Sequence, residues 1–130
     1  METRHFLTQL RSRHFHEVQD ALFYFGDLFE YGQPISEEAY LDLIRELTDQ
    51  LMKPYMVGNR ADFLGLLESA FYSNNPNGSI STETLVEAVT YIAKTKDERF
   101  KGILAPLSHH PRLKPVLKAY FSEIGHPLPD

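Results

Sequence analysis

Six histidines are the side chains in this sequence best suited to binding a transition metal. Zinc needs ligands that are brought together on one helix face or in a closed knuckle. His14 and His16 lie two residues apart and point in different directions on a helix, and the adjacent His109 and His110 also diverge. No His-Glu-x-x-His pattern is present. We therefore expect no metal site among the histidines, and no cofactor.

Patterns that carry catalytic chemistry are also missing. The sequence has no glycine-rich phosphate loop and no nucleophile elbow. Glu37 and Glu38 are adjacent carboxylates, but they stand at a predicted helix start, where the positive end of the helix dipole explains them. The absence of cysteine excludes a thiolate nucleophile, a disulfide and Cys-ligated zinc. The sequence predicts that the protein is not an enzyme.

Residues 73–84, SNNPNGSISTET, place oxygen-bearing side chains at the spacing of a calcium-binding loop. With Gly78 at the sixth position, Ser73, Asn75 and Asn77 occupy the first, third and fifth positions, which are ligand positions. This pattern resembles the loop of the EF-hand family. The resemblance covers the loop and its flanks only, and it implies a helix–loop–helix that could hold calcium.

The same loop lacks the charges that calcium requires. Its side chains at the first, third, fifth, ninth and twelfth positions are all uncharged. Thr84 stands where the family has a bidentate glutamate, and Glu83 is one position too early. We expect a turn and helix cap at 73–84, a degenerate EF-hand-like loop with weak or no calcium binding.

The formal net charge of −5 is unevenly distributed. Residues 17–49 contain a single base, Arg45, and nine acids: Glu17, Asp20, Asp27, Glu30, Glu37, Glu38, Asp42, Glu46 and Asp49. Residues 94–118 contain a basic patch of seven cations: Lys94, Lys96, Arg99, Lys101, Arg112, Lys114 and Lys118. Clustered cations suit phosphate contacts, so a nucleic-acid-associated regulatory protein is one alternative function. Nucleic acid is the less favoured partner, because the chain is acidic overall and shows no recognition-helix pattern.

The bulk composition is that of one globular domain. The 130 residues are 42% hydrophobic and 24% charged. No apolar run approaches the roughly 20 residues of a membrane span, and the N-terminus lacks the apolar block of a signal peptide. We expect a single helical domain over 1–130, with a flexible tail at about 126–130, no membrane contact and a cytoplasmic location, with which the lack of cysteine agrees.

Apolar residues recur at helical spacing, which predicts an all-α bundle of five to six helices, with two helix–loop–helix units as one arrangement. The first helix spans 14–31, and residues 4–13 form either its first turns or a short separate helix. Further helices are expected to begin after Ser36, Asn59, Ser81 and Thr95, and the helix after Ser36 is expected to end before Pro54. A last helix carries residues 116–124. Residues 107–115 contain two prolines and predict an irregular or 3₁₀ connection.

Local signals specify several helix ends. Ser36 and Ser81 are predicted N-caps. Each follows directly after an apolar residue, and a second apolar residue stands at the fourth position after each. Thr95 to Glu98 reads as a capping box that opens the fifth helix. Gly125 is predicted at the C′ position of the last helix.

The first helix has two apolar stripes, which predicts that it is either central in its domain or part of an interface. Phe15, Val18, Leu22, Phe25 and Phe29 form the main stripe, and Tyr24, Leu28 and Tyr31 form the second. Phe23 projects away from the main stripe. We hypothesise that Tyr24, Leu28 and Tyr31 contact a partner, together with the carboxylates of Glu37, Glu38 and Asp42.

These observations predict a non-enzymatic protein–protein interaction module, a small helical adaptor, regulator or inhibitor. Its partner is expected to be another protein or a second copy of this chain. The alternatives are a degenerate EF-hand-like protein and the nucleic-acid-associated regulator already described.

Overall fold

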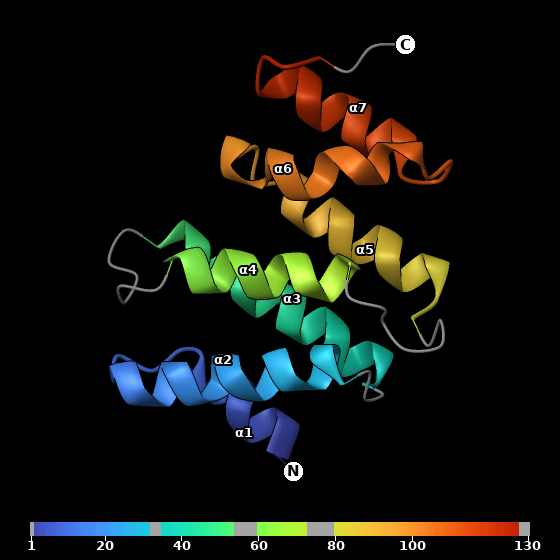
Figure 1. The fold of residues 1–130 in the computed structure, drawn as a ribbon. Helices are drawn as coiled ribbons and strands as arrows, with labels where there is room; N and C mark the ends of the chain where they lie inside the picture. Colours follow the sequence, from blue (N-terminus) through green and yellow to red (C-terminus); the bar gives the residue numbers. More distant parts are fainter. Residues whose placement is uncertain (1, 32–34, 54–59, 73–79, 128–130) are drawn as a thin grey trace. The chain divides into compact units, whose positions relative to one another are not determined.

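The computed structural model describes residues 2–31, 35–53, 60–72 and 80–127 (Figure 1). These residues form helices and no strand. The prediction of an all-α protein is confirmed, with seven α-helices and two 3₁₀ segments in the described part rather than five to six helices. None of the described helices is long and apolar enough to cross a membrane.

The chain divides into two compact units, Met1–Ser81 and Thr82–Asp130, called unit 1 and unit 2 below. Each unit has its own buried apolar residues. The single domain over 1–130 stays a prediction.

Unit 1 contains four helices, which are α1 (Glu2–Gln9), α2 (Phe15–Glu30), α3 (Glu37–Met52) and α4 (Arg60–Tyr72) (Figure 1). The segment before α2 is therefore a separate helix. Both α1 and α4 pack on α2, and α3 packs on α1 and α4. The two apolar stripes of α2 thus reflect a central position in the unit.

The start of α3 follows its sequence signals. The Ser36 hydroxyl accepts a hydrogen bond from the backbone N–H of Ala39 at 3.1 Å, as an N-cap does. Ile35 and Tyr40, the predicted apolar pair on either side of the cap, are both buried. The Tyr40 hydroxyl donates to the carbonyl oxygen of Ala70 at 3.0 Å, which ties α3 to α4, and burial raises the pKa of Tyr40 well above its usual value.

A polar network links the residues after α1 to α3. The Glu46 side chain is 8% exposed. One of its carboxylate oxygens accepts from Arg11 Nε at 2.5 Å, and the other accepts from Gln50 Nε2 at 2.9 Å. The exposed Arg11 guanidinium has a raised pKa, caused first by the hydrogen bond that it donates to Glu46 and then by the negative charge of Glu46. A buried carboxylate is tolerated here because both of its oxygens are hydrogen-bonded.

Unit 2 contains α5 (Thr82–Ala93), the 3₁₀ segment η2 (Glu98–Phe100), α6 (Lys101–Leu104), the 3₁₀ segment η3 (Ala105–His109) and α7 (Lys114–Glu123). The predicted 3₁₀ connection is present over its first part, in η3. Buried residues come from every α-helix of the unit: Thr84, Ala88, Val89, Ile92, Ala93, Ile103, Leu104, Leu117, Tyr120 and Phe121.

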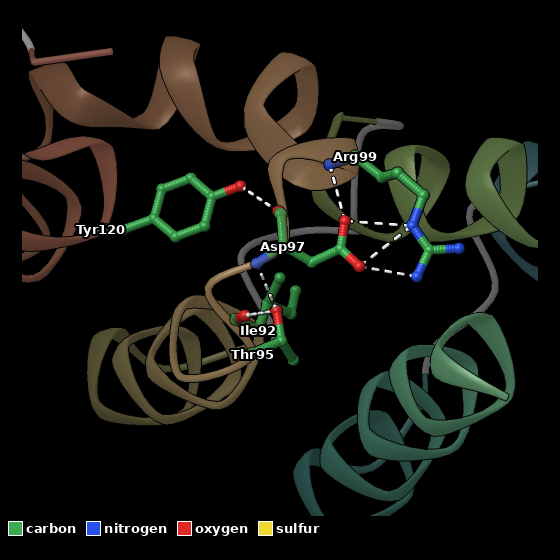
Figure 2. A network of polar contacts seen from close by, with 5 residues as sticks. All are labelled: Ile92, Thr95, Asp97, Arg99 and Tyr120. Carbon is green, nitrogen blue, oxygen red and sulfur yellow. Dashed lines mark hydrogen bonds and ion pairs between the residues drawn. The ribbon is translucent and has the colours of Figure 1, made fainter. Parts of the chain in front are cut away.

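The predicted capping box at Thr95 is wrong. The Thr95 hydroxyl instead donates to the Ile92 carbonyl at 2.7 Å and accepts from the backbone N–H of Asp97 at 3.3 Å, so it finishes α5 (Figure 2). Asp97 is the N-cap of the next segment, because its Oδ1 accepts from the Arg99 N–H at 2.9 Å. Both Asp97 carboxylate oxygens also accept from the Arg99 guanidinium, which raises the pKa of Arg99.

The end of α7 follows the prediction for Gly125. This residue has φ +80°, in the left-handed region that glycine adopts without strain. The His126 N–H bonds to the Phe121 carbonyl at 2.9 Å and the Gly125 N–H to the Ser122 carbonyl at 3.2 Å, the two bonds of a Schellman motif.

Tyr120 on α7 donates its hydroxyl to the Asp97 carbonyl oxygen (Figure 2). Burial, with smaller contributions from Asp97 and Glu98, raises the pKa of Tyr120 from 10.0 to about 12. Because the folded pKa lies above the unfolded one, the resulting stabilisation is complete below pH 10 and is lost as the pH rises toward 12.

We therefore expect an alkaline tyrosinate titration with a component near pH 12 that Tyr120→Phe removes. The measurement is the ultraviolet difference absorbance between wild type and variant. A difference that titrates near pH 10 would mean that this hydroxyl is solvated.

Candidate functional site

The outer side of α2 carries charged and aromatic residues. His16, Asp20, Phe23, Asp27 and Glu30 recur every three or four positions, and all are exposed. The opposite side of the helix is the buried one, with Val18, Ala21, Leu22, Phe25, Leu28 and Phe29.

Two aromatic side chains on this outer side stand out by their exposure. Phe23 is 64% exposed, and Tyr31, the C-cap residue of α2, is 71% exposed. We call Asp20, Phe23, Asp27, Glu30 and Tyr31 the acidic–aromatic face. Its three carboxylates make no ion pair with any described residue. The face therefore presents negative charge around uncovered aromatic surface.

A groove of about 460 Å³ lies beside this face, between α2 and α4 of unit 1. Gly26 leaves part of the groove open, since a Cβ placed there would have no described atom within 4 Å apart from the neighbouring backbone of α2 itself. Asp27 and Glu30 contribute charge to the groove, and Phe23 contributes an aromatic ring. Its lining residues are Leu22, Phe23, Gly26, Asp27, Phe29, Glu30 and Ser69.

The predicted interface residues on α2 have different environments. The ring of Tyr24 stacks on Phe6 of α1 with centroids 4.1 Å apart, and its hydroxyl is 3.0 Å from the Thr3 hydroxyl. Leu28 is buried. Tyr24 and Leu28 thus take part in the packing of unit 1, and Tyr31 alone of the three is largely exposed.

The predicted acidic contacts lie at the start of α3. Glu37, Glu38 and Asp42 are exposed. The Glu37 carboxylate accepts from the Ser81 N–H, and Asp42 lies 3.8 Å from Arg45 in a weak exposed pair. None of the three lines the groove.

Three members of the predicted basic patch in unit 2 are occupied by ion pairs. Lys96 pairs with Glu123 at 3.5 Å, Arg99 with Asp97 at 2.6 Å, and Arg112 with Glu83 at 2.9 Å. The hydrogen bond from Arg112 is the first cause of the lowered pKa of Glu83. The exposed Lys94, Lys101, Lys114 and Lys118 follow or belong to three different helices. Much of this patch is neutralised within unit 2.

Most of the EF-hand-like loop lies outside the described residues. Residues 73–79 are not described, and Thr84, at the twelfth position, is buried in the first turn of α5. Within the described ranges, no group of three or more His, Asp or Glu side chains could hold a metal ion.

The hypothesis from sequence did not include Phe23 and Gly26. A signal for Phe23 was present, because it lies off both apolar stripes of its helix. A glycine inside a helix also carries a signal, since it weakens the helix and needs a local reason.

Comparison with protein-family models, with curated proteins and with solved structures gave no match.

Proposed function

We propose that this protein is a non-enzymatic protein-binding module and that the acidic–aromatic face of α2 is its contact surface. The observation that carries the proposal is the 64% exposure of Phe23 at a groove, on the same side of α2 as three carboxylates that make no ion pair with the described residues. Exposed apolar residues occur singly on most proteins, but here two aromatic side chains and a groove lie on one helix.

The chemistry of the face resembles that of protein interfaces. Aromatic residues supply a large contact area at low entropic cost and dominate binding energies when a partner covers them. Carboxylates around them select the partner by charge and accelerate its approach. Tyr24 and Leu28 support this surface from the inside, by fixing α2 against the rest of unit 1.

Phe23→Ser tests this assignment. We expect the free energy of unfolding to change by no more than about 0.5 kcal/mol, because the side chain is mostly exposed. We expect partner affinity to fall by about 2 kcal/mol, roughly 30-fold, if Phe23 is an interface anchor. Wild type and variant are immobilised, and the proteins that each retains from a cell extract are compared. The dissociation constant of a retained partner is then measured by calorimetry for both.

Phe15→Ser is the matched control, since Phe15 is on the same helix, is 44% exposed and does not line the groove. It should retain the partner. Equal retention of the partner by wild type and Phe23→Ser would contradict the assignment of the face.

A further inference from the structure

We propose that the groove between α2 and α4 binds a basic amphipathic segment of another protein. In this arrangement an apolar side chain enters over Gly26, while lysine or arginine side chains meet Asp27 and Glu30. This inference rests on the proposed function and adds the chemistry of the partner.

Gly26 gives the first argument. It lies inside α2, where glycine is less favourable than alanine. Its φ is not in the left-handed region, and a Cβ would meet nothing within 4 Å. Neither the backbone nor the packing of the described part of unit 1 therefore requires glycine at this position. The missing side chain instead leaves space in a groove whose exposed apolar surface comes mainly from Phe23, with the buried Leu22 and Phe29 beneath it.

Charge complementarity gives the second argument. Asp27 and Glu30 are one helical turn apart and both line the groove, and Asp20 lies on the same side of α2. None of them pairs with a described cation. Unit 1 as a whole has twelve Asp and Glu against six Lys and Arg. A cation placed here would also lie near the exposed ring of Phe23, where cation–π attraction favours it.

The size of the groove fits a short segment. Its lining on α2 runs from Leu22 to Glu30, which is about 12 Å along a helix at 1.5 Å per residue. That length accommodates about two turns of a partner helix. A second copy meeting this face with its own α2 is disfavoured, because the carboxylates of both copies would then approach one another.

The experiment uses three labelled peptides of equal length and the full chain. One peptide is an amphipathic helix of leucine and lysine, the second has glutamate in place of lysine, and the third has lysine with serine in place of leucine. Fluorescence anisotropy gives each affinity. We expect the leucine–lysine peptide to bind at least tenfold more tightly than either of the others.

Two variants test where the peptide binds. Asp27→Asn with Glu30→Gln should weaken binding of the leucine–lysine peptide about tenfold and reduce its salt dependence. Gly26→Ala should also weaken it about tenfold, because the methyl group fills part of the groove. The thermal midpoint of the Gly26→Ala variant should not fall below that of wild type, since alanine favours the helix. Gly102→Ala, an exposed glycine of α6 with the same free space, is the control and should leave binding unchanged.

The inference is overturned if the leucine–glutamate or the lysine–serine peptide binds as tightly as the leucine–lysine peptide, or if Gly26→Ala binds it normally. It is also overturned if no peptide binds, or if the groove is occupied by self-association that Gly26→Ala abolishes. If Phe23→Ser still loses a protein partner in any of these cases, the proposed function stands and only the basic chemistry of the partner is wrong.

Discussion

Phe25→Ala lowers the free energy of unfolding of unit 1 by about 3–5 kcal/mol, the largest effect that we expect from a single substitution. Phe25 is 0% exposed and lies on α2, against which both α1 and α4 pack. Its ring contacts that of Tyr24, with centroids 5.1 Å apart. Alanine leaves a cavity that these helices can fill only in part. Since small domains have about 5–15 kcal/mol in total, this loss is a large fraction of the stability of unit 1.

Denaturant unfolding measures the loss in the free energy of unfolding, and hydrogen exchange shows which helices lose protection. Phe23→Ala is the matched control, because it makes the same change two residues earlier on the exposed side of α2. We expect it to cost less than about 1 kcal/mol. Similar losses for the two variants would show that α2 is rotated from the orientation described. Exchange rates in α5 and α7 of the Phe25 variant report how strongly unit 2 depends on unit 1.

Arg11→Ala has the second-largest expected effect. It leaves the Glu46 carboxylate, 7% exposed as a whole residue, with Gln50 as its remaining described side-chain partner. Removing one member of a buried pair leaves a charge without compensation, which costs about 2–5 kcal/mol. We expect about 2 kcal/mol, because Arg11 itself is mostly exposed and its loss admits water. Chemical denaturation of wild type and variant gives this difference.

Glu46→Gln in the Arg11→Ala background separates charge from packing. Glutamine has the same shape as glutamate and needs no cation, so it should recover about half of the loss or more. If the double variant is no more stable than Arg11→Ala, then the arginine acts through its aliphatic stem.

The helix pattern and several helix ends were predictable because their causes are local. Ser36 caps α3 through its own hydroxyl, and Gly125 ends α7 because it accepts a positive φ. The capping box at Thr95 failed for a physical reason. A hydroxyl followed by acidic residues can finish one helix or start the next, and here the Thr95 hydroxyl donates to the Ile92 carbonyl, which also accepts from the Thr95 N–H at the end of α5.

The face of α2 could be predicted only in part. The two apolar stripes were correct as a pattern, but periodicity does not say what covers each stripe. The ring of Phe6, on a short helix that sequence left undecided, covers Tyr24, while Phe23 remains open. Phe15 belongs to the predicted main stripe, yet it is 44% exposed because it is the first residue of α2 and has no preceding turn beside it. The groove depends on the approach of α2 and α4, which no local signal encodes.

The bond from Tyr120 to the Asp97 carbonyl has a consequence for the order in which a nascent chain matures. These residues are 23 positions apart, so the turn after α5 lacks this anchor until the ribosome has released α7. Every packing partner within unit 1, by contrast, precedes Thr82. The helices of unit 1 can therefore consolidate during translation before α7 is made, while the turn after α5 waits for α7.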